Sequence, residues 1–481
     1  MNPTDMYHPK KGVKEQFDSL FYTRRDFLNR MGTGVGSLAL ATMLGENLVS
    51  SAAAQSSNSG LLAPKQPHFT GTAKRVCHIM MSGGQASQDT WNPAPELASR
   101  AGESGPGGGK KGGMGGGKLL PPQFKFIKQG KSGVEVSEVW KELGPMVDDM
   151  TIIRSMWTDV PAHEEATLIQ TTGDFRLPKP SMGAWVTYGL GTENQNLPAF
   201  VAMNPGGFPT GGTKNWQSAF MPGAYQGTFV DPTNTRIELI IENIKNNVTS
   251  AGEQRQQLDL LYQLNELHKQ KRAAESQLDA RIQSFELAYR MQTDATEAFD
   301  TTKEPESITK MYGTTRHGRA FLIARRLLER GVRFVQVWQG GWDTHAGIVN
   351  AMTRNATESD QAQAAFLKDL KQRGLLKDTL VVSSTEFGRS STEDGPGGRT
   401  HNAKAFASWM AGGGVKGGYA HGATDELGAA SVEKKVHVHE LHSTILHTLG
   451  FDSEKLTFRN GGRDFRLTDV SGAQPVKEVL A

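Results

Sequence analysis

An aspartate and a histidine stand two residues apart where an apolar run ends, and both are residue types that bind metals. The segment GGWDTHAG, residues 340–347, closely follows VRFVQVW, residues 332–338. If the extended backbone continues past the strand, Asp343 and His345 point to the same face. An imidazole and a carboxylate that converge with other such groups form a plausible divalent-metal site. A simple polar turn is the alternative interpretation.

Further polar residues stand close to the ends of other apolar runs: Asp89, His163, Glu386, Arg389 and His401. Each alone is more often solvated or structural. Because ligands bind at the carboxyl ends of strands in open parallel sheets, we expect these side chains to converge with the first pair. The metal ligands expected are Asp89, Asp343, His345, Glu386 and His401.

Two of these residues have a catalytic role in this hypothesis. His163 acts as a base or as a further ligand, and Arg389 holds an oxyanion through two parallel hydrogen bonds. A surface ion pair is the alternative for Arg389. Zinc or manganese is the favoured ion, with magnesium and calcium as alternatives.

The elements that must position these residues alternate regularly. Apolar runs at 76–81, 150–155, 332–338, 379–385 and 405–413 predict strands, and segments 319–331, 359–374 and 436–450 predict helices. This alternation predicts an α/β fold, with a mostly parallel sheet covered by helices on both faces. The expected domain covers residues 74–475.

Two segments interrupt the expected domain. Residues 101–118, AGESGPGGGKKGGMGGGK, have the composition of a disordered loop. Within an insertion at about residues 236–300, leucines recur at helical spacing from Leu258 to Leu267. We expect a helix or helical hairpin there that packs on the main domain.

The N-terminal segment predicts export. Arg24 and Arg25 precede Phe27 and Leu28, a weakly apolar stretch follows, and Ala52 to Ala54 form a cleavage motif. Residues 1–54 are therefore expected to be a twin-arginine signal read by the translocase, and residues 55–73 a flexible lead-in. The apolar stretch is too short and too weak for a permanent membrane span. The expected location is the periplasm or the exterior.

The composition of the chain gives no support to nucleic-acid binding and excludes internal disulfides. The net charge of the 481 residues is only +3, which gives no reason to expect a nucleic-acid partner. Cys77 is the single cysteine, so an internal disulfide is excluded, and its apolar surroundings predict a small buried side chain.

Two other groups of residues have competing interpretations. His439 and His442, close to His437, are one helical turn apart and could share a ligand, although capping or flanking a helix is the favoured interpretation. Five tryptophans could stack on sugars, although core packing is favoured for most of them: Trp157, Trp185, Trp216, Trp342 and Trp409.

Several motifs occur in one order along the chain: RRDFL, SGGQASQDTWNP, RSMWTDVPAHEEA, PSMGAWVTYGLGTENQNLPAF, LLERGVRFVQVWQGGWDTH, GLLKDTLVVSSTEFGR, GRTHNAKAFASWMAGGGVKGG and HELHSTILHTLG. Together they resemble the exported bacterial family known as domain of unknown function 1501, from the export signal to about residue 470. That family resembles a branch of the alkaline phosphatase/sulfatase superfamily. The resemblance implies an alkaline-phosphatase-like, metal-dependent hydrolase fold.

The resemblance also implies roles for single residues. Asp89 matches the first metal-binding aspartate of the superfamily, and Asp343 with His345 its central pair. Glu386 stands where a carboxylate follows the next strand, and His401 where a late histidine ligand falls.

The chain departs from the superfamily pattern at three positions. Phe387 follows Glu386 where phosphatases carry a histidine, His163 stands in the place of a side-chain nucleophile, and Asn92 replaces a second aspartate. The chain also has no sulfatase maturation motif, so formylglycine chemistry is excluded.

Two hypotheses remain. The first is a hydrolase of phosphate- or sulfate-type esters, on a small-molecule or polysaccharide substrate, in which a metal activates water. Ser87, Thr158 and Thr167 are weaker candidates for a side-chain nucleophile. The second is a catalytically silent envelope protein that binds a polysaccharide or a protein partner.

Overall fold

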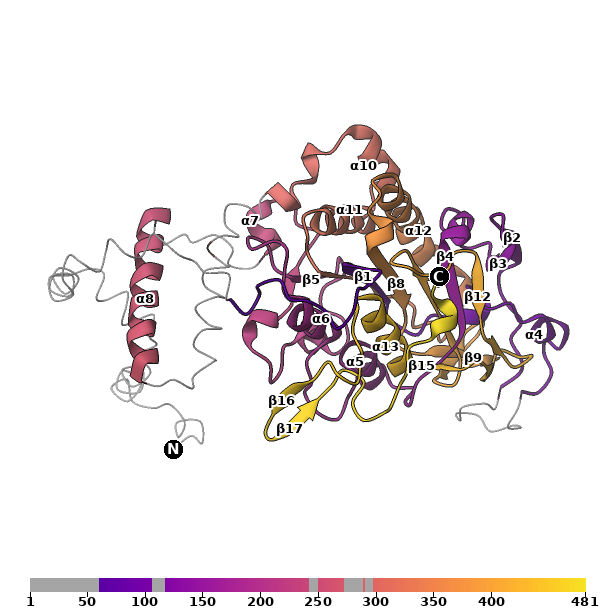
Figure 1. Ribbon diagram of the computed structural model, residues 1–481. Coiled ribbons are helices and arrows are strands. Elements are labelled where there is room, and N and C mark those ends of the chain that lie inside the picture. Colours follow the sequence, from indigo (N-terminus) through magenta and orange to yellow (C-terminus); the bar gives the residue numbers. More distant parts are fainter. Residues whose placement is uncertain (1–59, 106–116, 242–249, 272–288, 290–296) are drawn as a thin grey trace, which may run out of the picture. The chain divides into compact units, whose positions relative to one another are not determined.

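The computed structural model describes residues 60–105, 117–241, 250–271, 289 and 297–481 (Figure 1). The predicted export signal at 1–54 lies outside these residues, as do residues 106–116 of the glycine-rich loop and much of the predicted insertion. In the part of the chain that is described, no helix is long and apolar enough to cross a membrane.

A nine-stranded sheet forms the centre of the fold. Its strand order is β12-β4-β11-β8-β1-β7-β5-β6, and β15 also pairs with β4. The strands are β1 (Arg75–Met81), β4 (Met150–Trp157), β5 (Phe200–Met203), β6 (Thr228–Val230), β7 (Phe334–Gln339), β8 (Thr379–Ser384), β11 (Phe406–Ala411), β12 (Tyr419–His421) and β15 (Val436–His437). Only β11 runs antiparallel to its neighbours, and every other adjacent pair is parallel. The predicted mostly parallel sheet is confirmed.

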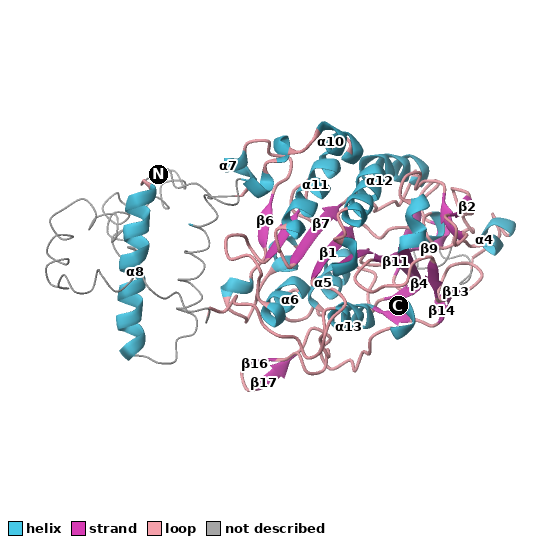
Figure 2. Cartoon of the chain, turned by 45° about the horizontal axis from the view of Figure 1, so that its top comes forward, coloured by secondary structure: helices cyan, strands magenta, loops and turns pink. Residues whose placement is uncertain are grey.

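Helices cover both faces of this sheet (Figures 1 and 2). They are α5 (His163–Thr172), α6 (Met182–Leu190), α10 (Glu306–Tyr312), α11 (Arg316–Glu329), α12 (Ile348–Gln372) and α13 (Val438–Thr448). Because side chains alternate along a strand, β1 contributes to two cores. Cys77 and Ile79 pack with residues of α11 and α12, whereas Val76 and Met80 pack with residues of α6 and α13. The predicted α/β class is confirmed.

The described residues also form smaller elements that are not part of the nine-stranded sheet. They are four two-stranded hairpins and three helices: β2–β3 (Phe126–Gln129 and Val134–Ser137), β9–β10 (Gly388–Glu393 and Arg399–Asn402), β13–β14 (Ala423–Thr424 and Ser431–Glu433), β16–β17 (Phe458–Asn460 and Arg463–Phe465), α4 (Pro95–Ser99), α7 (Ile237–Ile240) and α8 (Ala251–Lys271). The β9–β10 hairpin leaves β8 and leads into the reversed strand β11. The sequence pattern did not predict this hairpin, which carries His401.

The helix predicted near residue 258 is present as α8. The packing of the insertion on the main domain stays a prediction. The loop predicted to be disordered was 101–118; its described ends, 101–105 and 117–118, include an isolated bridge between Ser104 and Lys118, and disorder of the other residues stays a prediction.

The described part of the predicted flexible lead-in, residues 60–73, is instead bound to the domain. The Lys65 amide donates to Leu190 O at 2.9 Å, the Phe69 amide to Gly450 O at 3.1 Å and the Ala73 amide to Thr448 O at 2.9 Å. Leu62 and Ala73 are also buried. Carbonyl groups at the ends of α6 and α13 lack partners within their own helices, and this segment satisfies them.

Candidate metal centre

Three adjacent parallel strands, β8, β1 and β7, deliver their following loops to one edge of the sheet. Gly83 follows β1, Asp343 follows β7 and Glu386 follows β8. His163 begins α5 beyond the end of β4, and His401 comes from β10. The topology therefore brings residues from distant parts of the sequence together at the carboxyl edge.

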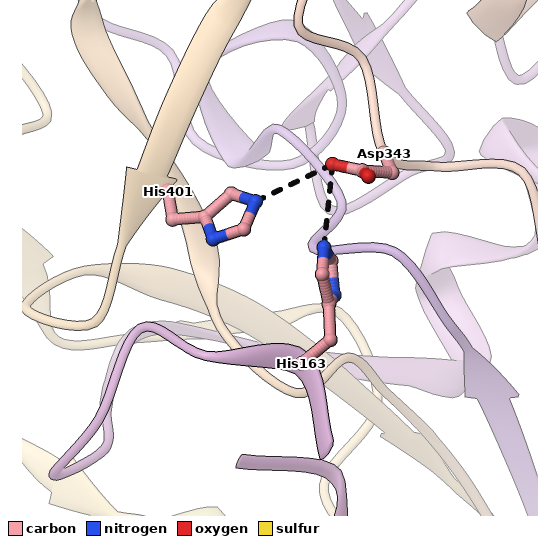
Figure 3. A group of neighbouring side chains, drawn as sticks. All are labelled: His163, Asp343 and His401. Atoms are coloured by element: carbon pink, nitrogen blue, oxygen red, sulfur yellow. Dashed lines mark ion pairs between the residues drawn. The ribbon is translucent and has the colours of Figure 1, made fainter. Parts of the chain in front are cut away.

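One oxygen of Asp343 lies at the centre of this group. Its Oδ1 is 3.3 Å from His163 Nε2, 3.0 Å from His345 Nε2 and 3.4 Å from His401 Nε2. Figure 3 shows the His163 and His401 rings directed at the Asp343 carboxylate from two sides. Potential ligand atoms of His163, Asp343 and His401 all lie within 4.8 Å of one another. We call His163, His345 and His401 the converging histidines.

The other ring nitrogen of each converging histidine is held by an oxygen. His163 Nδ1 lies 2.7 Å from Glu386 Oε1, His345 Nδ1 lies 2.6 Å from Asp394 Oδ2, and His401 Nδ1 lies 2.7 Å from Pro161 O. Ionised carboxylates and carbonyl groups only accept hydrogen bonds, so each Nδ1 must donate. In a neutral ring, Nε2 is then left with a lone pair.

The Nε2 atoms of two of these rings face each other. His345 Nε2 and His401 Nε2 are 3.0 Å apart. Two nitrogen lone pairs repel at that separation, so a proton or a metal cation must lie between them. Metal-binding histidines commonly donate their second ring nitrogen to a carboxylate or a backbone carbonyl, which is the arrangement seen at all three rings.

The spacing of the donor atoms fits a metal ion. Ligands about 2.0–2.1 Å from a tetrahedral zinc are about 3.3 Å from one another, and the distances around Asp343 Oδ1 span 3.0–3.4 Å. The buried His163 Nε2 has no hydrogen-bond partner in the part of the chain that is described. His163, Asp343 and His401 supply two nitrogens and one oxygen within 4.8 Å of one another, and His345 adds a nitrogen beside Asp343 and His401. Zinc accepts such nitrogen and oxygen donors readily.

Charges and burial shift the pKa values at this site. Burial alone would raise the pKa of Asp343, but the guanidinium of Arg389 and the nearby imidazoles lower it to about 2. Burial opposes the charged form of His163, yet the Glu386 carboxylate outweighs it, so the pKa of His163 is raised. Burial lowers the pKa of His401. Asp343 is therefore ionised at neutral pH and can serve as a ligand.

The structure does not support the predicted role of Arg389 in holding an oxyanion. Arg389 is fully buried, and its Nε donates to Gly84 O at 2.8 Å and its Nη1 to Arg399 O at 3.0 Å. Its Nη2 donates to both Gly83 O and Asp343 Oδ1. Four of its five N–H groups are thus engaged. Arg389 therefore holds the loop that follows β1 through its two glycine carbonyls, and its positive charge offsets the negative charge of Asp343.

Two predicted ligands also have other partners. Asp89 forms a fully buried ion pair with Arg399, with Asp89 Oδ2 2.8 Å from Arg399 Nε, and its Oδ1 accepts from the Gln123 amide at 2.6 Å. The structure therefore does not bring Asp89 to the converging histidines. Glu386 Oε1 accepts from the Gly83 amide at 2.8 Å as well as facing His163 Nδ1, so this oxygen of Glu386 orients the His163 ring.

Sequence analysis did not identify Asp394, the partner of His345. The loop that carries it is bound to the segment after β7: the Gly395 amide donates to His345 O at 2.9 Å and the Arg399 amide to Thr344 O at 3.0 Å. A Cβ atom on Gly398 would lie 2.1 Å from the His345 carbonyl, so only glycine allows this approach. The glycine-rich run DGPGG, residues 394–398, precedes His401 and is the sequence signal from which this tight loop could have been predicted.

The structure does not place the other candidate nucleophiles at the pocket beside the site. Ser87, Thr158 and Thr167 are buried and do not line the pocket beside the site. This pocket has a volume of about 280 Å³ and is lined by His163 and Asp343, together with Ser82, Asn204, Phe208 and Trp338.

The five candidate tryptophans and the histidines at the start of α13 have structural partners. Trp185, Trp216, Trp342 and Trp409 are buried in the core, and Trp157 packs against the ring of His437. His437 is the N-cap of α13, and its side chain forms a capping box with Glu440. The favoured interpretation of these histidines as a helix cap and its flanks agrees with the structure.

The fold and the site together define an α/β protein with a candidate divalent-metal centre at the carboxyl edge of its sheet. The chain belongs to the family described as "Protein of unknown function (DUF1501)", which it matches over residues 73–480. The resemblance predicted from the motifs is thus confirmed. No curated protein matches the chain.

Solved structures similar to this chain include one described as a protein in the alkaline phosphatase superfamily. The lipoteichoic acid synthase LtaP from Listeria monocytogenes has 8% identity and a TM-score of 0.37, with 82% of this chain and 76% of that chain covered. A protein in the alkaline phosphatase superfamily from Vibrio parahaemolyticus has 9% identity and a TM-score of 0.36, covering 82% and 71%. The phosphonate monoester hydrolase SpPMH from Silicibacter pomeroyi has 10% identity and a TM-score of 0.35, covering 85% and 76%.

Proposed function

We propose that this protein is a metal-dependent hydrolase of phosphate- or sulfate-type esters. One observation carries the proposal: the three converging histidines have their Nδ1 atoms fixed by acceptors and their Nε2 atoms gathered on Asp343 Oδ1. Such pre-orientation is typical of metal ligands and has no use in a solvated turn.

The donor set favours zinc, or manganese, over magnesium and calcium, which prefer oxygen ligands. A divalent ion bound there would lower the pKa of a water molecule toward neutrality and so supply a nucleophile. This chemistry needs no serine, threonine or cysteine. It therefore suits this chain, in which His163, at the start of α5, occupies the position where a side-chain nucleophile would be expected.

The chain's own residues prepare the site in three ways. Glu386, Asp394 and Pro161 O fix the ring orientations of the converging histidines. Arg389 keeps Asp343 ionised and limits the negative charge of the site. The pocket beside His163 and Asp343 offers room for an ester group and for part of the alcohol to which it is linked.

The test is a panel of phosphate and sulfate monoesters, assayed with metal-loaded protein, with chelated protein and after metal is returned. We expect hydrolysis of at least one ester, its loss on chelation and its recovery with zinc or manganese. Hydrolysis that is insensitive to chelation would contradict the metal mechanism. Metal binding without any hydrolysis would favour a silent envelope protein that binds a polysaccharide or a protein partner.

We further propose that the protein acts in the periplasm or outside the cell, after export through the twin-arginine translocase. The support is the RRDFL motif at residues 24–28 and the alanines that end at Ala54. Replacing Arg24 and Arg25 by lysine should keep the protein in the cytoplasm, as cell fractionation would show. Unchanged delivery of the double variant would contradict this proposal.

A further inference from the structure

Three aromatic rings pack together at the pocket beside the candidate metal centre. The rings of Phe208 and Phe229 are stacked at 4.7 Å between centroids, and those of Trp216 and Phe229 at 5.4 Å. Trp216 is only 2% exposed, which anchors the group in the core, whereas Phe208 is 63% exposed and lines the pocket. The exposed ring is therefore held in a fixed position with apolar surface facing solvent.

The rest of the pocket lining is uncharged, apart from His163 and Asp343. Ser82, Asn204 and Thr210 contribute groups that form hydrogen bonds, and no lysine or arginine is among the described residues that line it. Trp338 also lines the pocket, and its buried indole N–H has no hydrogen-bond partner within the described part of the chain. A strongly anionic group would find no countercharge here beyond the metal centre.

This lining matches a ring with an apolar face and a polar edge. A sugar ring and an aromatic alcohol both have such a face, and either can stack on a phenylalanine. The volume of about 280 Å³ lies just below the range of about 300–1,000 Å³ for ligand pockets, so a single ring is the unit that fits.

We propose that Phe208 is a specificity-determining residue that binds the face of one uncharged ring in the alcohol part of the substrate. The reacting ester group then lies at His163 and Asp343, which line the same pocket. This inference rests on the proposed ester hydrolysis at that site.

The experiment measures binding of probes that carry no ester, by saturation-transfer NMR on metal-loaded protein. The probes are methyl β-D-glucopyranoside, phenol and, as an open-chain control, glycerol. We expect at least one ring probe to bind more tightly than glycerol, and the preferred probe tells a sugar from an aromatic alcohol. Phe208→Ala should weaken ring binding about tenfold, whereas Phe208→Trp should retain it. Val432→Ala, at another exposed apolar residue, is the matched control and should leave binding unchanged.

Equal binding of all three probes, or ring binding by Phe208→Ala that equals the wild type, would overturn the inference. An ester that contains the preferred ring should also show a raised KM in Phe208→Ala with little change in kcat. Because the probes carry no ester, their binding is measured whether or not the protein hydrolyses anything. Absence of ring binding by the wild-type protein, with hydrolysis intact, would refute the role of Phe208 alone, and ring binding without hydrolysis would refute the proposed reaction.

Discussion

Two groups of three histidines in this molecule have opposite arrangements. In the converging histidines, each Nδ1 faces an acceptor and the Nε2 atoms gather at Asp343. In the α13 histidines, which are His437, His439 and His442, each Nε2 has an oxygen partner of its own. These partners are Asp159 Oδ2 at 3.1 Å, Gly173 O at 2.8 Å and Gln170 O at 2.8 Å.

The difference shows that proximity of histidines does not make a metal site. The α13 histidines are closer together in the sequence, but each of their Nε2 atoms faces a different oxygen, in the loop before α5, within α5 or at its end. The converging histidines come from three distant segments, and their anchored Nδ1 atoms leave the Nε2 atoms directed at one point. In the proposed metal site, the ring nitrogen left free by the anchored Nδ1 is the one that would bind the ion.

The largest difference between the groups should appear in activity. Asp343→Ala or His401→Ala removes a ligand, so we expect hydrolysis to fall roughly thousandfold, which corresponds to the several kcal/mol that a catalytic metal supplies. His439→Ala, the control from the α13 group, should keep activity within a few-fold. The measurement is kcat/KM on the best ester of the panel. If all three variants lost kcat/KM equally, the converging histidines would not differ from the α13 histidines in function.

The second prediction concerns acid stability. Burial lowers the pKa of His442 to about 3 and that of His78 to about 3, against about 6.5 in an unfolded chain. The unfolded state therefore binds more protons between these values, so stability is complete above about pH 6.5 and falls as the pH drops toward 3.

We expect a loss of a few kcal/mol in the free energy of unfolding between pH 7 and pH 4, measured by urea titration. His442→Gln removes one of the two titrations and should flatten this dependence, although it lowers stability at pH 7. A variant with the same pH slope as the wild type would show that His442 does not resist protonation in the folded state.

Two carboxylates, one in each group of histidines, test whether holding a ring nitrogen in place affects metal binding. Asp394 holds His345 Nδ1 at 2.6 Å, and Asp159 holds His437 Nε2 at 3.1 Å; both are partly exposed. Asp394→Asn should weaken metal affinity about 10–100-fold, as removal of a partner behind a metal ligand typically does. Asp159→Asn should leave affinity unchanged. Metal titration followed by calorimetry compares the two, and identical affinities would argue against an anchoring role for Asp394.

The smallest effect is expected at the helix cap. His437 accepts from the His439 amide at 3.2 Å, and Glu440 Oε2 accepts from the His437 amide at 2.7 Å. His437→Ala should lower stability by about 1 kcal/mol, the typical value for a lost N-cap, with no change in metal content. Thermal unfolding measures the first and elemental analysis the second. Loss of metal in this variant would mean that the α13 histidines belong to the site after all.

Sequence patterns predicted β1, β4, β7, β8 and β11 because apolar runs report burial on both faces, but not the shorter strands β5, β6, β12 and β15. They also predicted that Asp343, His345, His163 and His401 would meet, since strand order follows general rules of parallel sheets. They did not predict what each carboxylate does. Asp89 and Glu386 have the residue type of a ligand, but their roles depend on Arg399 and on His163 Nδ1, which loop geometry brings near. The β9–β10 hairpin sets that geometry, and its turn depends on close backbone contacts that residue types alone do not reveal.

Metal content tests the central claim most directly. The mature protein is reconstituted separately with zinc, manganese, magnesium and calcium, freed of excess ion and measured by elemental analysis, with His345→Ala and His439→Ala beside it. We predict about one equivalent of zinc or manganese in the wild type and in His439→Ala, and a large loss in His345→Ala. A wild-type protein that retains none of the four metals would contradict the account.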